Sequence, residues 1–246
     1  MDNNYQHAAI KDKRIVILGG TKGIGKATAV AAAAAGGKVV VVSSGKKNVD
    51  ATLAELGHGH EGLVVDLANE ESIRNLFEKI GNFDHLVFTA GDALKIGSLS
   101  TMDRDEARKF FDIRYWGAVM SVKYASPHIN KGGSIILTSG GAAHRPGSGW
   151  SIAASICAAM EGFTRAMALE LAPLRVNLVA PGLVRTDLWS SFSASEREKM
   201  FAYFGGALPV AHVGEPEEIA KSYLYLMTQT YSTGQCIVAD GGGGLV

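Results

Sequence analysis

A cluster of glycines directly after a short apolar segment is the feature that most constrains the fold of this chain. Residues 14–18 (RIVIL) are mostly β-branched, which predicts a strand buried on both faces. Gly19, Gly20, Gly23 and Gly25 follow, and an alanine-rich helical segment begins behind them. A strand, a glycine turn and a helix in this order direct backbone N–H groups and a helix N-terminus at one point, where they can bind a phosphate. The sequence therefore predicts nucleotide binding.

Strand and helix alternate along the rest of the chain. This alternation predicts an α/β fold: a doubly wound, Rossmann-like parallel sheet of seven strands with helices on both faces. The 246 residues suffice for one such domain over residues 14–246. We expect residues 1–13 to form a flexible tail and residues 183–209 a flap over the substrate. Further strands are expected near residues 38–42, 62–66, 84–89, 134–138, 175–179 and 236–239, and long helices over 102–129 and 151–171.

Charge and cysteine content exclude several classes of function. The chain has 24 basic and 24 acidic residues, and this zero net charge disfavours a nucleic-acid partner recruited by charge. Cys157 and Cys236 lie far apart in the sequence, which suits a reduced compartment. No signal-peptide core and no run of about 18 uninterrupted apolar residues is present. These observations predict a cytoplasmic protein without a nucleic-acid or membrane partner.

Two kinds of nucleotide site are compatible with the glycine turn. Residues 20–26 (GTKGIGK) match the start of a P-loop, whose next residue must be Ser or Thr to hold Mg²⁺. Ala27 stands at that position, which argues against an ATPase or GTPase. The alternative is a variant dinucleotide fingerprint, in which Gly19, Gly23 and Gly25 permit a tight turn and the close approach of a pyrophosphate.

Further motifs lie at the ends of later strands. They are Asp66-Leu67, Ala90-Gly91, Pro181-Gly182 with Val184 and Thr186, and Asp240-Gly241-Gly242. Together with the glycine turn they resemble the short-chain dehydrogenase/reductase family over about residues 13–243. Leu18, Phe88 and Thr89 depart from the usual residues of that family. The resemblance implies a nicotinamide dinucleotide as cofactor and a small molecule as substrate.

The end of the second predicted strand distinguishes NADP from NAD. An NAD-binding fold places an acid there for the ribose 2′-hydroxyl, whereas this chain has Ser43 and Ser44. Lys22, and Lys46 or Lys47, can supply positive charge for a 2′-phosphate, and in the resembled family a basic residue at the position of Lys22 goes with NADP. We therefore predict NADPH/NADP as the cofactor. The predicted cofactor-binding residues are Gly19, Thr21, Lys22, Gly23, Ile24, Gly25, Ser43, Ser44, Lys46, Asp66, Leu67, Ala90, Gly91, Pro181, Gly182, Val184 and Thr186.

The expected catalytic centre departs most from the resembled family, whose chemistry uses a tyrosine, a lysine four residues later, a serine and an asparagine. Ser139 matches the serine, and Arg114 stands at the asparagine position. Two registers are possible for the tyrosine and the lysine: Ala153 with Cys157, or Ile152 with Ile156. Neither register supplies a phenol or an ammonium group, so the resemblance implies an atypical member.

Other groups must then polarise a carbonyl and supply a proton. His144 follows Ser139 in the same loop and is either a proton donor near neutral pH or a surface histidine beside Arg145. Arg114 either orients an anionic substrate or stabilises an oxyanion, or it pairs with Asp112 or with a partner chain. The predicted catalytic residues are therefore Ser139, His144 and Arg114.

Two other groups of residues give only weak indications of a functional site. His58 and His60 have no evident third ligand, so no metal site is expected. Residues 149–153 (GWSIA) lack the last glycine of a nucleophile elbow, which argues against a hydrolase.

The function that follows is an NADP(H)-dependent oxidoreductase with a non-standard catalytic centre, acting on a carbonyl or alcohol. The alternative is a non-catalytic NADP(H)-binding sensor or regulatory module. The two long predicted helices carry more apolar surface than one sheet face needs, and the resembled family assembles through these helices. We therefore expect a homodimer or a homotetramer.

Overall fold

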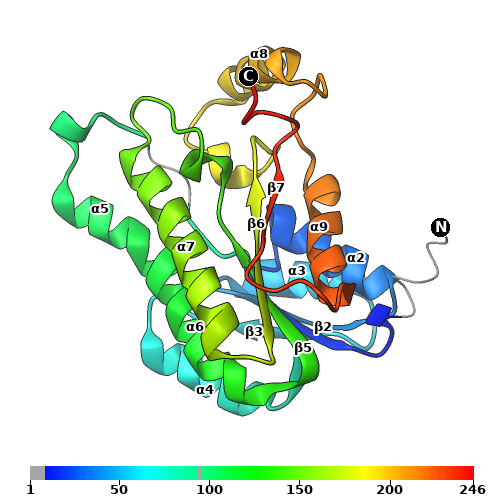
Figure 1. Cartoon of the computed structure of the whole chain (residues 1–246). Coiled ribbons are helices and arrows are strands. Elements are labelled where there is room, and N and C mark those ends of the chain that lie inside the picture. The colour runs from blue at the N-terminus through cyan, green and yellow to red at the C-terminus, as the bar shows by residue number, and fades with distance from the viewer. Residues whose placement is uncertain (1–8, 93–95) are drawn as a thin grey trace.

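The strands form one parallel sheet, as the alternation predicted. The structure is a computed structural model and describes residues 9–92 and 96–246. The sheet has seven strands in the order β3-β2-β1-β4-β5-β6-β7 (Figure 1), and every pairing is parallel. The strands are β1 (Arg14–Leu18), β2 (Lys38–Ser43), β3 (Glu61–Val64), β4 (Phe83–Phe88), β5 (Ile129–Thr138), β6 (Arg175–Pro181) and β7 (Cys236–Ala239).

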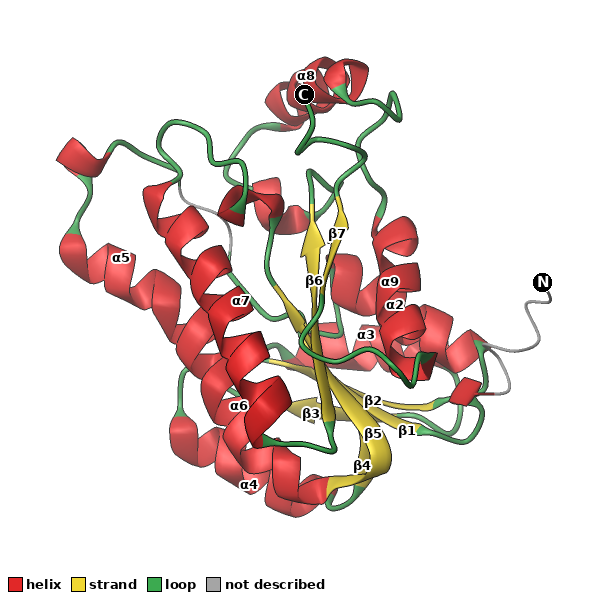
Figure 2. Cartoon of the chain, viewed as in Figure 1, coloured by secondary structure: helices red, strands yellow, loops and turns green. Residues whose placement is uncertain are grey.

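Helices cover both faces of this sheet (Figure 2). The apolar layer on one face includes Tyr223 of α9, and the layer on the other face includes Phe77 of α4; both side chains are fully buried. Sheets of this kind bury both faces, which explains the nearly continuous apolar strands. The first face is covered by α2 (Gly23–Ala34), α3 (Lys46–Leu56) and α9 (Pro216–Thr228), and the second by α4 (Glu70–Ile80), α6 (Ala118–Ala125) and α7 (Ser151–Glu170).

The strand order reverses at β1 and β4. Leu18 at the end of β1 pairs with Val42 of β2 on one side and with Phe88 of β4 on the other. Connections leave the two strands toward opposite edges of the sheet, so a crevice opens at their carboxyl ends, where such folds bind ligands. The glycine turn and the loops after β4, β5 and β6 therefore meet at one edge of the sheet.

The helix predicted over residues 102–129 is helical over residues 104–125, but a π-helical turn interrupts its α-helical geometry. Helix α5 (Arg104–Phe111) passes into a π-helical turn, η2 (Asp112–Gly117), before α6 begins. Gly117 packs so closely that a Cβ there would lie 2.8 Å from the Leu67 carbonyl oxygen. A π turn redirects the side chains around it and is frequent at functional sites. Arg114 lies within this turn.

Two other predicted boundaries move because of tertiary contacts. The tail expected over residues 1–13 is ordered at its end, because Ile10 is fully buried in the apolar layer with α2, and the Asp12 N–H donates to the Gly36 carbonyl at 2.9 Å. Residues 1–8 of this prediction lie outside the described residues. Strand β5 begins at Ile129 instead of Ser134, and Gly133 allows it to lie directly against the Asp84 carbonyl.

The segment expected as a flap over residues 183–209 contains a short 3-10 turn and a 14-residue helix. They are η5 (Asp187–Trp189) and α8 (Ala194–Ala207), and α8 lies beyond the carboxyl ends of β6 and β7 (Figure 1). The base of the segment is anchored, because the buried Trp189 donates from Nε1 to the Val184 carbonyl at 3.0 Å.

Helix α7 is, within the described part of the chain, the one helix long and apolar enough to span a membrane, with a mean hydropathy of 1.3. In this structure it packs on the sheet and contributes Ile156 and Met160 to the core. Helices that cover a sheet face share this length and composition.

Candidate active site

The glycine turn is built by close backbone approaches. Gly19 has φ +84°, and a Cβ there would lie 2.6 Å from the Ala90 nitrogen. A Cβ at Gly25 would overlap both the Gly19 carbonyl oxygen and Thr89 Oγ1. Thr89 itself donates from its backbone N–H and its hydroxyl to the Leu18 carbonyl, at 2.8 and 3.0 Å. The turn after β1 and the end of β4 therefore form one rigid unit.

Helix α2 starts at Gly23 without a side-chain cap. Lys22 occupies its N-cap position, and its first turn contains no acidic residue. By contrast, α4 is capped by Asn69, which accepts from the Ser72 N–H at 2.9 Å. The first N–H groups of α2 and the positive end of its dipole are thus available to an anion. Together with the close-packed glycines, these donors fit the pyrophosphate of a dinucleotide.

Four of the predicted cofactor-binding residues lie at or directly after the ends of β2 and β3. Ser43 closes β2 and Ser44 is exposed next to it, so no carboxylate occupies this position. Leu67 is buried, whereas Asp66 is exposed and its Oδ1 accepts from the Ala68 N–H at 2.9 Å. The fold brings all four predicted residues to the crevice edge of the sheet.

Both predicted phosphate-binding lysines are in exposed ion pairs. Lys22 Nζ lies 3.5 Å from Asp187 Oδ2, and Lys46 Nζ lies 2.8 Å from Asp50 Oδ2. Exposed ion pairs contribute only about 0–1 kcal/mol, so a ligand phosphate can displace either carboxylate at little cost. Lys22 also lines a groove between the glycine turn and Thr186, which lies in the segment after β6. Lys46 does not line this groove.

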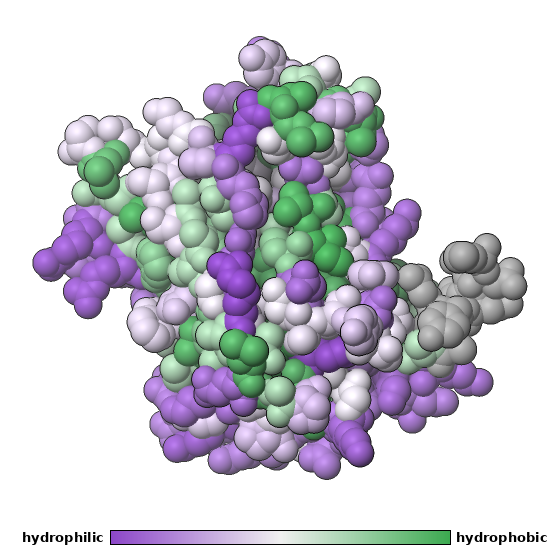
Figure 3. Space-filling model, viewed as in Figure 1, coloured by the Kyte–Doolittle hydropathy of each residue, from purple (hydrophilic) through white to green (hydrophobic). Residues whose placement is uncertain are grey.

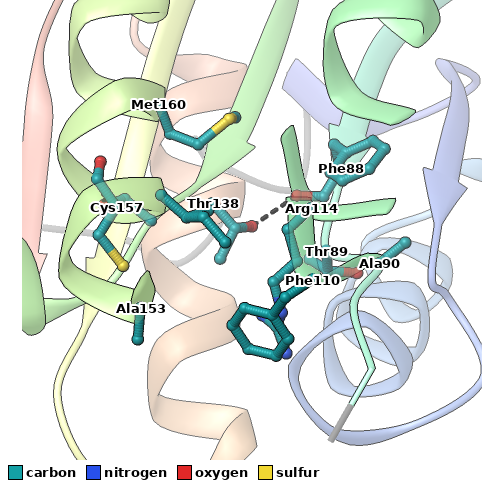
Figure 4. A pocket seen from close by; sticks show the side chains of 11 residues that line it. Phe88, Thr89, Ala90, Phe110, Arg114, Thr138, Ala153, Cys157 and Met160 are labelled. Carbon is teal, nitrogen blue, oxygen red and sulfur yellow. Dashed lines mark hydrogen bonds between the residues drawn. The ribbon is translucent and has the colours of Figure 1, made fainter. Parts of the chain in front are cut away.

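A small pocket lies at the carboxyl ends of β4 and β5 (Figure 4). Cys157 and Ala153 of α7 form one side of it, and Arg114 and Phe110 the other. Ser139 lies at its base, and its hydroxyl donates to the Cys157 carbonyl at 3.0 Å. The lining residues are Phe88, Thr89, Ala90, Phe110, Arg114, Thr138, Ser139, Ala153, Ile156, Cys157 and Met160.

The pocket distinguishes the two registers proposed for the missing tyrosine and lysine. Ala153 and Cys157 both line it, whereas in the second pair Ile156 lines it and Ile152 does not. Residues four apart share one helix face, so the Ala153–Cys157 register is the one that faces Ser139. No lining residue carries a phenol or an ammonium group. Burial raises the pKa of the Cys157 thiol, which favours the neutral form and a packing role.

Arg114 is the charged group of this pocket. Its guanidinium lies 4.9 Å from the Phe110 ring centroid and donates to the Asp92 carbonyl, while its buried Nε has no hydrogen-bond partner. Burial lowers the pKa of Arg114, but a guanidinium stays charged near neutral pH. Among residues 9–92 and 96–246 no carboxylate forms an ion pair with it, so the alternative pairing with Asp112 does not occur.

His144 does not reach the pocket. Its Nε2 lies 2.9 Å from Glu161 Oε1 of α7, one turn beyond Cys157. The neighbouring Arg145 instead donates to the Gly243 carbonyl at 3.0 Å. The predicted proton-donor position is therefore incorrect in this structure, because Glu161 holds the imidazole away from the pocket. Glu161 lies 17 residues from His144, and no local pattern in the sequence indicates the pair.

The predicted residues after β6 form the far wall of the crevice. Pro181 ends β6, and a Cβ on Gly182 would lie 2.7 Å from Asp240 Cα. Val184 is buried and bridges to Gly214.

Thr138 at the end of β5 also lines the pocket, but it is not among the residues predicted from the sequence. Its position directly before Ser139 at the end of a strand is the one signal that could have indicated it.

A doubly wound parallel sheet with an uncapped helix N-terminus behind a glycine turn defines a dinucleotide-binding domain. Comparison with known proteins narrows this class. A family model described as enoyl-(acyl carrier protein) reductase matches residues 19–243. The short-chain dehydrogenase/reductase ATR9 of Stachybotrys chlorohalonatus is 34% identical over 95% of this chain and 97% of its own. Carbonyl reductase family member 4 of Xenopus laevis is 34% identical over 94% and 97%.

Solved structures agree with this family. A small-chain dehydrogenase in complex with NADPH is 33% identical, with a TM-score of 0.82 over 96% of this chain and 100% of the other. The MalC reductase/Diels-Alderase of Malbranchea aurantiaca is 25% identical, with a TM-score of 0.91 over 99% and 100%. The chain belongs to the short-chain dehydrogenase/reductase family of oxidoreductases.

Proposed function

We propose that this protein is an NADPH-dependent reductase of a carbonyl group whose active site works with Ser139, which matches the family serine, and Arg114, which stands at the asparagine position, without the tyrosine and lysine of its family. The observation that carries the proposal is the half-buried guanidinium of Arg114, which lines the same pocket as Ser139 at the ends of β4 and β5, keeps a buried Nε without a partner and has Asp92 as its nearby acidic group. The name of the carbonyl reductase relative and the NADPH complex of a structural relative support the reaction and the cofactor.

The proposed chemistry assigns separate tasks to the side chains. Bound NADPH supplies a hydride. Arg114 stabilises the negative charge that develops on the carbonyl oxygen, which is worth more in a partly buried pocket than in water. Ser139 Oγ orients the same oxygen once its hydroxyl turns from the Cys157 carbonyl to the substrate, and Phe88 and Met160 exclude water from one wall. The reduced oxygen takes its proton from solvent, because the pocket holds no side chain that titrates near neutral pH.

The loss of a built-in acid predicts modest turnover on simple ketones. General acid catalysis contributes about 10²–10⁴-fold. A conjugated carbonyl compound that accepts the hydride at its β-carbon needs that acid least, because the product is an enolate whose negative charge is delocalised. The preferred substrates are therefore expected to be conjugated or to carry an anionic group that Arg114 can hold.

Turnover separates this proposal from its alternative, a non-catalytic NADP(H)-binding sensor. The measurement is NADPH oxidation over a panel of ketones, aldehydes and conjugated carbonyl compounds, with the Ser139→Ala variant as reference. Wild-type rates above the reference with at least one substrate support the enzyme. NADPH binding without any rate above the reference would instead favour the sensor.

Lys22 is proposed to bind the 2′-phosphate of NADPH. Replacing Lys22 by alanine is expected to weaken NADPH binding by about 10–100-fold, because a charge-assisted hydrogen bond contributes about 1.5–3 kcal/mol. NADH binding should change by less than about threefold, since NADH lacks that phosphate. Fluorescence titration of both cofactors measures the difference, with Lys79→Ala on α4 as the control. An equal loss for both cofactors would contradict this assignment.

A homodimer or homotetramer is proposed from the outer face of α7. Only a third of its apolar stretch is buried in the single chain, and Leu169 is 84% exposed. Trp116 in η2, the π turn before α6, is 53% exposed. Figure 3 shows pale and green surface over the region of α7. Covering such a face stabilises an assembly through apolar burial. Light scattering at micromolar concentration should give a mass of two or four chains, and a monomeric mass would refute the proposal.

A further inference from the structure

Three side chains with metal-binding atoms meet beside α7, one helical turn beyond the pocket residue Cys157. They are His144 from the loop after β5, Glu161 from α7 and Cys236 from the start of β7. One ligand atom of each lies within 4.8 Å of the others. None of the three lines the active-site pocket. The cluster is therefore separate from the chemistry proposed above.

The carboxylate of this cluster is only partly compensated for its burial. Glu161 is 9% exposed, and its Oε1 is buried without a hydrogen bond of good geometry. The nearest groups are His144 Nε2, at 2.9 Å from Oε1, and Arg165 Nη1, at 3.7 Å from Oε2. A buried carboxylate is costly unless a cation or well-placed donors pair with it. A cation beside Oε1 would meet this requirement.

The donor types indicate which cation fits. Zn²⁺ accepts imidazole nitrogen, carboxylate oxygen and thiolate sulfur together, whereas Mg²⁺ and Ca²⁺ prefer oxygen ligands alone. Bond lengths of about 2.0–2.3 Å place tetrahedral zinc ligands about 3.3–3.8 Å apart. The observed separations reach this geometry through small rotations of the exposed His144 and the partly exposed Cys236. Arg165 beside Oε2 leaves Oε1 as the single carboxylate ligand.

We propose that His144 Nε2, Glu161 Oε1 and Cys236 Sγ bind one Zn²⁺ ion, with water at the fourth position. Three protein ligands and one open position are a common zinc arrangement. The ion joins the loop that begins after Ser139 to α7 and to the edge strand β7. Binding deprotonates the Cys236 thiol and releases its proton to solvent.

Cobalt titration of the full-length, metal-stripped protein tests this site, because Co²⁺ bound to a thiolate shows a charge-transfer absorption band. One Co²⁺ per chain is expected to produce the band, and added Zn²⁺ should remove it. Cys236→Ser should abolish the band, and His144→Ala should weaken Co²⁺ binding by at least about tenfold, since even outer-shell changes cost 10–100-fold. Cys157→Ser and His58→Ala are the matched controls and should retain it.

Two results would overturn the proposal. One is the absence of a saturable band at one equivalent of Co²⁺, and the other is a band that survives Cys236→Ser or disappears with Cys157→Ser. If Cys236→Ser does not fold, X-ray absorption of the Zn²⁺-loaded wild-type protein replaces it. One sulfur ligand together with nitrogen and oxygen ligands supports the site, and a shell without sulfur refutes it.

Discussion

Replacing Arg114 by alanine is expected to lower kcat/KM for NADPH-dependent reduction by about 10²–10³-fold, the usual effect of removing one donor that stabilises a developing oxyanion. The expectation rests on the position of the guanidinium: it lines the pocket together with Ser139, and its buried Nε has no hydrogen-bond partner, so its charge is available to the substrate. NADPH affinity should change by less than about tenfold, because the residue contributes to the reacting centre more than to the cofactor groove. Steady-state kinetics on the best substrate of the panel, with fluorescence titration of NADPH, measures both quantities.

Two further variants show whether the geometry of Arg114 matters besides its charge. Arg114→Lys keeps the charge but loses the planar fork, and it should recover only part of the activity. Arg108→Ala removes an exposed arginine from the preceding helix α5 and should leave kcat/KM unchanged. Wild-type activity in Arg114→Ala, or an equal loss in Arg108→Ala, would show that Arg114 does not act on the substrate.

Replacing Gly25 by alanine is expected to abolish measurable NADPH binding and to lower Tm. The added Cβ would overlap the Gly19 carbonyl oxygen and Thr89 Oγ1, so the backbone of the glycine turn must move away from these atoms. This displacement falls in the turn that is proposed to bind the pyrophosphate. Overpacking of this kind costs about 1–3 kcal/mol. In a domain of this size that cost corresponds to roughly 2–12 °C in Tm. Calorimetry and NADPH titration test the two effects separately.

The control for this substitution is Gly206→Ala. Gly206 lies in α8, and a Cβ there meets no atom within 4 Å. Alanine at an exposed helix position is favoured over glycine by about 1 kcal/mol, so Tm should stay the same or rise. NADPH binding by Gly25→Ala at the wild-type affinity would contradict the proposed cradle.

Features that depend on neighbouring residues could be predicted from the sequence. The β-branched runs, the glycine turn and the Asn69 cap each reflect local backbone preferences, and each is confirmed. The π turn before α6 and the early start of β5 could not be predicted in this way. Both depend on close approaches to distant backbone atoms, at the Leu67 and Asp84 carbonyls.

The same distinction between local preferences and long-range contacts applies to the candidate site. Sequence motifs predicted a cofactor-binding edge of the sheet and an active site without the family tyrosine and lysine, but they left two registers open on α7. Packing selected Ala153 and Cys157, because only that pair faces Ser139 in the folded chain.

The sequence by itself determined a doubly wound sheet with a nucleotide-binding turn, because apolar periodicity and glycine spacing act through local backbone geometry. Only the tertiary structure decided which side chains meet. It placed Arg114 in the pocket without a carboxylate partner, and it held His144 against Glu161 near Cys236. Such encounters join residues that are far apart in the chain, and they arise from the packing of whole helices on the sheet.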